Sequence, residues 1–461
     1  MSQRVSNLDN PSHLRCSSSG TSNTSDQPPC EYIDDVRLDW SGRGTSHVDY
    51  DKSDVLPLTQ GEFLGHGMHG GVYETSCNGV KLAWKRKYCR RKIGEREMRE
   101  IETIKKLSHR HIIRLMGTYT HGPFLGLLLW PVATCDLATL LEDVDWLQEK
   151  VLVDYANEPG LSVKQSEHDA DREARFCALG ILTQDPEIDS HPARHFLKQT
   201  IGCIASAVAY LHASNVKHKD LKPSNILLSR DGLWLADFGT ATDFSVLTSS
   251  VTDEGDRGTQ KYFAPEVARF APSGRSADVF SLGCILFEVV TLYIGYSLAF
   301  SQRLRRSPDK SFQSNLDQIV GWFGEAMPIG STASDDYLLG LVRWMMEEEA
   351  AMRPTADVIE EEVSLINGLG LALCAKYARP TNRGFYRPCC LPEGHPDRRT
   401  DLLPNAKPVV SINVTYGTSY LMSSNSLECT VYLEHTGGDL VESVHMFTIS
   451  APGTTVRGEV C

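Results

Sequence analysis

The sequence predicts an α+β fold of two lobes, a strand-rich N-terminal lobe with one helix followed by a mostly helical C-terminal lobe. Between residues 56 and 131, short apolar runs with strand-like spacing are separated by turn residues, and one helical pattern occupies residues 95–107. From residue 132 to residue 370 the apolar residues recur mainly at helical spacing. We therefore expect a five-strand N-lobe at residues 56–131 and a C-lobe at residues 132–370.

The two ends of the 461-residue chain differ from this middle part in composition. Residues 1–55 are rich in Ser, Asn, Gly and Pro, and we expect a disordered Ser-rich tail because little apolar surface is available to offset the ordering entropy. Residues 371–461 are first rich in Pro and Arg and then alternate weakly between apolar and polar residues. This C-terminal extension is either a strand-rich addition, an independent interaction module, or unfolded.

The acidity of the chain is unevenly distributed. A formal net charge of −13 argues against broad binding to a phosphate backbone, so nucleic acid is not an expected partner. Residues 142–190 contain thirteen Asp and Glu but only four Lys and Arg, a balance of −9. We interpret this segment as an acidic insertion that is partly disordered. It either forms a docking surface for basic partners or is a solvated, variable loop.

Cysteine spacing and hydropathy bear on the compartment. The 13 cysteines show no zinc-ligand spacing and fit free thiols in a reducing compartment, so we expect a cytoplasmic location, with a nuclear one as the alternative. The most apolar stretch, residues 279–300, has Glu288 in its middle. A buried helix fits this stretch better than a membrane span, and no span is expected.

A glycine-rich turn is the first candidate binding element of the N-lobe. Gly65, Gly67 and Gly70 occur in a G-x-G-x-x-G pattern that continues through Val72 as a strand, so the glycines form a strand–turn–strand flap. Glycines let backbone amides approach phosphate groups closely. A tight hairpin without a ligand is the alternative interpretation of this pattern.

A lysine and a glutamate follow the flap. Lys85 is preceded by Ala83, whose small side chain leaves room for an aromatic ring, whereas the rivals Lys81 and Lys87 lack that context. Glu100 lies on the helix predicted at residues 95–107 and is the expected partner of the lysine. For each of these residues, a solvated surface position is the alternative.

The strongest signal lies between residues 216 and 239. Asp220, Lys222 and Asn225 occur on one loop, and Asp237 follows at the end of a strand in the sequence Asp-Phe-Gly. A small hairpin is predicted between the two segments, around the Asp-Gly turn at residues 231–232. Carboxylate and amide oxygens are the groups that a site needs to bind a divalent metal and to direct a hydroxyl nucleophile.

In these segments the chain resembles eukaryotic protein kinases of the serine/threonine type, over residues 56–370. Further similar segments are Gly258-Thr259 with the sequence from Tyr262 to Glu266, the helix start at Asp278, and Arg353 as partner of Glu266. The resemblance implies the bilobal protein-kinase fold, ATP and Mg²⁺ as cofactors, and protein substrates with Ser or Thr acceptors. It therefore predicts a transferase that moves the γ-phosphoryl group of ATP to a protein hydroxyl.

The resemblance also implies roles for single residues. Asp220 orients or deprotonates the substrate hydroxyl, Lys222 steadies the transferred phosphate, and Lys85 paired with Glu100 holds the nucleotide phosphates. Asn225 and Asp237 bind Mg²⁺. Lys222, two residues after Asp220, is what points to serine/threonine specificity. The residues expected to contact the nucleotide are Gly65, Gly67, Gly70, Val72, Ala83, Lys85, Leu129, Val132 and Leu227, with Leu129 as gatekeeper and 130–132 as hinge.

The sequence departs from the common kinase pattern at Lys219, where many kinases have Arg before the catalytic Asp. Lysine lacks the bidentate fork of arginine, so its hold on a phosphate is less directional. The loop sequence His218-Lys219-Asp220, followed by Asp-Phe-Gly-Thr-Ala, resembles a kinase group common in filamentous fungi. The chief rival function is a pseudokinase, an ATP-binding scaffold that acts through protein interactions.

Overall fold

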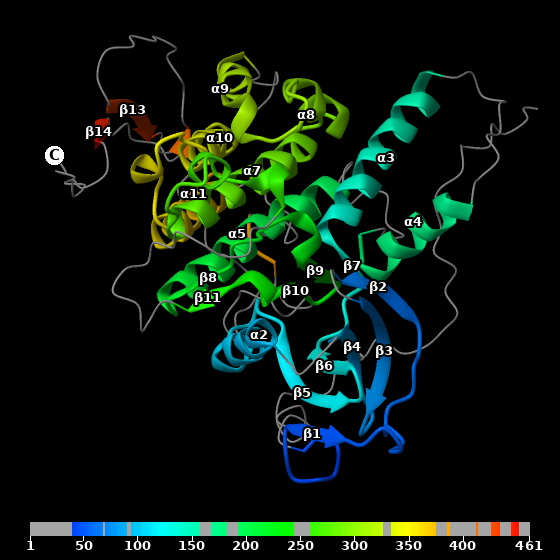
Figure 1. The fold of residues 1–461 in the computed structure, drawn as a ribbon. Helices are drawn as coiled ribbons and strands as arrows, with labels where there is room; N and C mark the ends of the chain where they lie inside the picture. The colour runs from blue at the N-terminus through cyan, green and yellow to red at the C-terminus, as the bar shows by residue number, and fades with distance from the viewer. Residues whose placement is uncertain are drawn as a thin grey trace, which may run out of the picture.

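The computed structural model shows the expected two lobes, a sheet-rich one and a helical one (Figure 1). The α+β bilobal architecture is therefore confirmed. The tail at residues 1–38 and parts of the acidic insertion and the C-terminal extension lie outside the described residues. The structure describes residues 39–67, 70–89, 94–156, 167–181, 192–243, 259–325, 333–374, 385–387, 412–413, 426–433 and 444–450.

The N-lobe sheet has six strands among the described residues, in the order β1-β5-β6-β4-β3-β2. Neighbouring strands are antiparallel except for β1, which runs parallel to β5. One more strand is present than the five that the sequence predicts. The strands are β1 (His47–Tyr50), β2 (Phe63–Gly67), β3 (Gly70–Cys77), β4 (Val80–Tyr88), β5 (Arg114–His121) and β6 (Phe124–Trp130).

The sixth strand corrects the expectation that residues 1–55 form a disordered tail. Residues 39–55 are ordered, and Trp40 is only 2% exposed in an apolar cluster with Tyr50 and Tyr119. A Cβ on Gly117 would lie 2.1 Å from the indole of Trp40, so this position leaves room for the ring. A few large side chains thus bury enough surface to order a segment whose overall composition resembles a tail.

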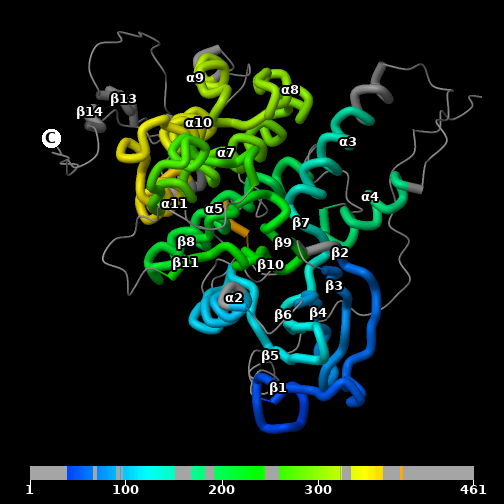
Figure 2. The backbone as a smooth tube through the Cα atoms, in the orientation of Figure 1, coloured from blue at the N-terminus to red at the C-terminus, as the bar shows by residue number. Residues whose placement is uncertain are grey.

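Helix α2 (Glu95–Lys106) covers the sheet at the junction with the second lobe (Figures 1 and 2). Its buried face carries Ile101 and Ile104, together with the charged Glu100, which is 3% exposed. Lys106 near the end of the helix reaches Asp243 in the other lobe at 2.6 Å. The helix predicted at residues 95–107 is confirmed, and it is the N-lobe element that meets both lobes.

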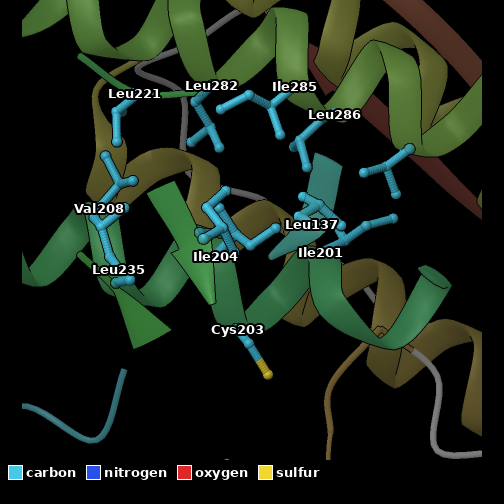
Figure 3. Packing of buried hydrophobic residues seen from close by; sticks show 14 of the residues in the cluster. Leu137, Ile201, Cys203, Ile204, Val208, Leu221, Leu235, Leu282, Ile285 and Leu286 are labelled. Carbon is cyan, nitrogen blue, oxygen red and sulfur yellow. The ribbon is translucent and has the colours of Figure 1, made fainter. Parts of the chain in front are cut away.

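The C-lobe is organised around α5 (Pro192–Ala213) and α7 (Arg275–Tyr293). Side chains of the two helices interdigitate in the main apolar core (Figure 3). Among the described residues α7 is the one helix long and apolar enough to cross a membrane, but 78% of that window is buried inside the protein. The other C-lobe helices are α3 (Leu137–Ala156), α4 (Glu167–Ala178), α6 (Pro265–Ala268), α8 (Leu298–Leu304), α9 (Leu316–Glu325), α10 (Ala333–Met345) and α11 (Ala356–Cys374).

Short strands line the boundary between the lobes. The predicted hairpin is confirmed as β9 (Ile226–Ser229) and β10 (Gly232–Leu235), to which β7 (Cys135–Asp136) adds a third strand. A second pair joins β8 (Val216–Lys217) to β11 (Thr242–Asp243). These two small sheets carry the loops at residues 218–225 and 236–241.

Part of the acidic insertion is helical. Helices α3 and α4 contact each other through Asp143, a 2%-exposed carboxylate that accepts hydrogen bonds at 2.7 and 2.8 Å from Arg175. Lys150 and Glu173 form a second contact at 3.2 Å. Several of the acidic groups therefore serve to join the two helices. Residues 157–166 and 182–190 of the insertion lie outside the described residues.

The C-terminal extension has both packed and strand-forming parts. Phe385, which is 1% exposed, packs on the C-lobe, and its carbonyl accepts a hydrogen bond from the amide of Gly202 at 2.9 Å. The C-lobe therefore includes residues beyond the expected boundary at residue 370. Strands β12 (Ile412–Asn413), β13 (Ser426–Leu433) and β14 (Val444–Ser450) pair antiparallel, as the strand-rich alternative predicts.

The cysteines differ in part from the expectation of free thiols. Cys177 on α4 is disulfide-bonded. The thiols of Cys77, Cys89, Cys135, Cys203 and Cys284 form no disulfide. Sequence spacing reveals only local cysteine motifs, so the disulfide of Cys177 could not be predicted from it.

Candidate active site

The centre of the candidate site is the loop between β8 and β9. Asp220, which is 4% exposed, holds Lys222 Nζ at 2.8 Å from its Oδ2 atom. The side-chain amide of Asn225 donates to the backbone carbonyl of Asp220 at 2.7 Å. The loop ends in a 3₁₀ turn at Pro223–Asn225. Residues five apart in sequence are thus brought together within one loop.

A buried carboxylate from α7 shapes this loop from below. Asp278 accepts the backbone N–H groups of His218 and Lys219, each at 2.9 Å, and Lys219 has a φ of +66°. The Nε2 atom of His212 lies 3.0 Å from the same carboxylate. Burial opposes the ionised form, but the histidine contacts and the amide bonds lower the pKa of Asp278. Asp278 therefore stays charged and fixes the backbone that presents Asp220.

Asp237 lies beside Asn225. The backbone N–H of Ala236 donates to the carbonyl of Asn225 at 2.9 Å, which places the next residue at the same end of the hairpin. Asp237 has a φ of +63°, a left-handed conformation that turns the chain after β10. Burial alone would raise the pKa of Asp237, but Lys85 outweighs burial and lowers the pKa to about 2.

Lys85 on β4 completes the predicted set. Its ammonium group lies 2.8 Å from Asp237 Oδ1 and 3.4 Å from Glu100 Oε1. Burial opposes its positive charge, but the two carboxylates outweigh that effect and raise the pKa of Lys85. Lys81 instead pairs with Glu74, with 69% of its side chain exposed. The structure therefore brings Lys85 and Glu100 together with Asp237 and leaves Lys81 on the surface.

The glycine-rich segment forms the expected strand–turn–strand flap. Gly67 and Gly70 are paired at the ends of β2 and β3. A Cβ on Gly70 would lie 1.8 Å from the carbonyl oxygen of Arg86, so another side chain does not fit without a backbone shift. Gly65 has a φ of +150°, a conformation that favours glycine. Residues 68–69 at the tip lie outside the described residues.

The residues expected around an adenine ring lie on adjoining strands. Val72 is the cross-strand partner of Lys85, and Ala83 is the partner of Leu129. Leu129 and Leu227 are both half-buried at the edge of the main apolar cluster, and Val132 is also half-buried just after β6. The strands thus present these side chains between the sheet of the N-lobe and the hairpin of the C-lobe.

Thr259, which the sequence analysis named only as part of a kinase-like segment, contacts the side chain of Asp220. Its backbone N–H and its hydroxyl donate to Asp220 Oδ1 at 2.7 and 2.9 Å, and its hydroxyl accepts a hydrogen bond from Lys222 at 3.0 Å. The signal that points to it is its place just before the segment Tyr262–Glu266. Lys87 was treated only as a rival of Lys85, although it too contacts Glu100.

The segment after Thr259 is anchored as expected. Arg353 donates to both oxygens of Glu266, at 2.8 and 2.9 Å, so the predicted pair forms a bidentate contact. The hydroxyl of Tyr262 donates to Glu288 at 2.8 Å, and Lys261 lies 2.7 Å from the same glutamate. The contacts of Tyr262 and Lys261 with Glu288 fix the segment on α7, and the Arg353 pair fixes its end at Glu266. Together they hold Thr259 against Asp220.

The donor chemistry of Asn225 and Asp237 suits a magnesium ion. Mg²⁺ prefers oxygen ligands and is held in such sites by one or two carboxylates together with substrate phosphates and water. Within the described ranges, no cluster of three or more His, Cys, Asp and Glu side chains has the arrangement of a protein-only metal site. The amide of Asn225 donates to a carbonyl, which directs its oxygen away from that contact. A metal at this place would therefore bind together with a nucleotide.

Comparisons with known proteins agree with this geometry. The family model of the protein kinase domain matches residues 180–363. The chain is 30% identical over 334 residues to the leucine-rich repeat receptor-like protein kinase PEPR1 of Arabidopsis thaliana, covering 69% of this chain and 24% of that protein. It is 31% identical over 307 residues to the calcium/calmodulin-dependent protein kinase cmkA of Emericella nidulans, covering 64% of this chain and 59% of that protein. It is 26% identical over 240 residues to the mitogen-activated protein kinase kinase kinase 13-A of Xenopus laevis, covering 52% and 19%.

The chain therefore spans less than two thirds of the length of each of these relatives. The fold and the grouped side chains agree with the match of residues 180–363 to the protein kinase domain. The similar proteins support the assignment of this chain to the eukaryotic protein kinase family. Such a domain implies the use of ATP and a divalent metal ion.

Proposed function

We propose that this protein is a Mg·ATP-dependent protein kinase that phosphorylates Ser or Thr hydroxyls of protein substrates. The observation that carries the proposal is the contact of Asp220 with both Lys222 and Thr259, beside the potential metal ligands Asn225 and Asp237. Phosphoryl transfer needs a positioned hydroxyl and compensated phosphate charge, and these groups supply both.

The proposed reaction uses the side chains as follows. The substrate hydroxyl oxygen attacks the γ-phosphorus of ATP, the bond from that phosphorus to the β–γ bridging oxygen breaks, and ADP leaves. Asp220 orients the hydroxyl and accepts its proton. Lys85 contacts the nucleotide phosphates, and Lys222 compensates charge on the transferred group. Magnesium, held by Asn225 and Asp237, supplies further compensation of phosphate charge when it is bound.

The serine/threonine preference is supported by the surroundings of Asp220. Lys222 Nζ lies 2.8 Å from Asp220 Oδ2 and 3.0 Å from the hydroxyl oxygen of Thr259. The same hydroxyl oxygen lies 2.9 Å from Asp220 Oδ1. These two side chains therefore crowd the Asp220 carboxylate. A short aliphatic hydroxyl fits this arrangement better than a phenol, whose hydroxyl is separated from its backbone by a ring.

Substitution of Asp220 tests the proposal. Asp220→Asn keeps the shape but removes the proton acceptor, so we expect kcat for phosphate transfer to a Ser/Thr peptide library to fall roughly 10³-fold. Mg·ADP binding should change little, because Asp220 does not contact the nucleotide in this proposal. Transfer of labelled phosphate and Mg·ADP titration measure the two quantities.

Asp231→Asn is the matched control, because Asp231 is exposed on the β9–β10 turn. It should retain the wild-type rate. If the wild-type protein binds Mg·ADP but transfers phosphate no faster than Asp220→Asn, the protein is an ATP-binding scaffold and the kinase proposal is wrong. Preference for tyrosine peptides would overturn the specificity part alone.

A further inference from the structure

Glu100 is contacted by two lysines. Its Oε1 atom lies 3.4 Å from Lys85 Nζ, and its Oε2 atom is in direct contact with Lys87 Nζ. The side chains are 2% exposed for Glu100, 9% for Lys85 and 6% for Lys87. Lysine is almost never this buried without a partner, so the pairing of Lys87 with Glu100 is a built feature of the interior.

The strand geometry explains why both lysines reach the same carboxylate. Successive side chains of a strand point to opposite faces, so residues 85 and 87 of β4 share the face that α2 covers. Arg86 between them points to the other face, where its guanidinium lies over the rings of Trp84 and Phe124 at 5.2 and 4.8 Å. The sequence Lys-Arg-Lys therefore places two cations, not three, against α2.

The two lysines divide their contacts unequally. Lys85 lies closer to Asp237, at 2.8 Å, than to Glu100, at 3.4 Å. Lys87 makes the closer contact with Glu100. Lys85, Lys87, Glu100 and Asp237 together carry two positive and two negative charges. Removal of Lys87 would leave Lys85 to compensate two carboxylates, in a site where water screens them poorly.

We propose that Lys87 is a positioning residue that holds Glu100, and with it helix α2, against the sheet independently of Lys85. Lys87 neutralises Glu100, so the positive charge of Lys85 is left for Asp237 and for the phosphates of a bound nucleotide. In this arrangement α2 keeps its place when Lys85 moves toward the nucleotide. The nucleotide part of this inference rests on the proposed function, whereas the position of α2 does not.

Amide hydrogen exchange over residues 95–106 tests the position of α2 directly. Lys87→Met should lower protection of these amides about 10-fold or more, while Lys85→Met should leave most of the protection in place. Lys81→Met is the matched control, since Lys81 lies on the same strand with its side chain 69% exposed. In Lys81→Met, the protection of these amides should match that of the wild type. Lys87→Arg, which keeps a cation, should retain more protection than Lys87→Met.

Nucleotide measurements provide a readout that a purely structural role would not move. In Lys87→Met, Lys85 should be drawn toward Glu100, so the Kd for Mg·ADP and the KM for ATP should rise about 10-fold while kcat changes less. Adding Glu100→Gln to Lys87→Met removes the uncompensated carboxylate. This double variant should bind Mg·ADP more tightly than Lys87→Met alone.

The outcomes separate this inference from the kinase proposal. Hydrogen exchange does not require turnover, so an inactive wild-type protein would overturn the proposed function and leave the test of α2 intact. The inference is wrong if Lys85→Met loosens α2 while Lys87→Met does not, or if both leave exchange unchanged. If Lys87→Met does not fold, the double variant Lys87→Met/Glu100→Gln is compared with Glu100→Gln alone. Amide protection of residues 95–106 should differ little between these two, because the carboxylate that Lys87 contacts is absent from both.

Discussion

Two buried carboxylates hold the two sides of the candidate active site, and they do so by different contacts. Asp278, 3% exposed, accepts two backbone N–H groups of the loop that presents Asp220. Glu100, also 3% exposed, is held by the ammonium groups of Lys85 and Lys87 at the ends of long side chains. One side is thus fixed through the backbone and the other through flexible side chains.

This difference in contacts indicates which side of the site can change its position. Backbone amides are placed by the chain itself, so a carboxylate that accepts them restrains the loop within a small range. Lysine ammonium groups move on several rotatable bonds, and a contact between them and a carboxylate survives a shift of the helix. We therefore expect the catalytic-loop side to keep its shape, while α2 responds to changes in charge.

Asp278→Ala is the substitution with the largest expected effect. It leaves the amides of His218 and Lys219 without their acceptor and His212 without its partner, all in the interior. We expect the free energy of unfolding to fall by about 3–5 kcal/mol, measured by urea denaturation. Phosphate transfer should be lost in the folded fraction as well, because the loop that carries Asp220 loses its restraint.

Asp317→Ala is a suitable control, because Asp317 lies exposed in the first turn of α9. Its free energy of unfolding should stay close to that of the wild type. If Asp278→Ala proves as mild as this control, the loop is not fixed through its backbone amides. The contrast between the two sides of the site would then disappear.

The two sides also differed in how far the sequence predicted them. Asp220, Asn225 and Asp237 lie within one short segment, so their sequence spacing already implied that they come together. Lys87 was not predicted as a contact of Glu100, because strand alternation gives the face of a side chain but not whether a lysine on that face is buried. Thr259 was named as part of a kinase-like segment, but its contact with Asp220 was not predicted because it joins residues 39 apart. Long-range contacts of this kind depend on the packing of whole elements.

The domain boundaries were missed for a related reason. Trp40 and Phe385 each lie in a segment whose composition resembles a tail, yet each is at most 2% exposed in the fold. A single aromatic side chain that fills a gap in a core contributes much apolar contact but little to average composition. Composition therefore placed both ends of the domain too far inward.

Arg387→Ala is expected to have an intermediate effect and shows whether the C-terminal extension supports the loop side. Arg387, 3% exposed, donates to the carbonyls of Arg230 and Gly232 at the tip of the β9–β10 hairpin, and its guanidinium lies 4.1 Å from the ring centroid of Phe196. Loss of these contacts should lower the free energy of unfolding by about 2 kcal/mol, measured by urea denaturation.

Arg269→Ala provides the comparison for Arg387. Arg269 pairs with Glu348 on the surface, with 63% of its side chain exposed, so its loss should lower the free energy of unfolding much less than the loss of Arg387. An equal effect of the two substitutions would mean that the extension does not stabilise the hairpin. Both variants should retain the Lys85–Glu100 side unchanged, as judged by hydrogen exchange in α2.

The smallest expected effect concerns His109, which links the end of α2 to the C-lobe. Its ring stacks on that of Tyr210 with centroids 4.6 Å apart, and the hydroxyl of Tyr210 accepts the backbone N–H of Ser108 at 2.8 Å. Burial, together with the nearby charges of His111 and Arg110, lowers the pKa of His109 from 6.5 to about 4. Between these pH values the unfolded chain binds the proton and the folded chain does not, so stability is full above about pH 6.5 and falls as the pH drops toward 4.

Urea denaturation of the wild type and of His109→Gln, at about pH 7.5 and about pH 5, isolates this titration. The substitution removes the stacking contact at both pH values. Its contribution therefore cancels when the change in the free energy of unfolding between the two pH values is compared for the wild type and the variant. We expect the wild type to lose about 1 kcal/mol more than His109→Gln on acidification, less than the full linkage value because His109 is partly exposed. His168→Gln, which changes an exposed histidine of α4, should keep the wild-type dependence. If His109→Gln also keeps the wild-type pH dependence of unfolding, protonation of His109 does not weaken the contact between the end of α2 and the C-lobe. The position of α2 would then depend on the lysine contacts of Glu100.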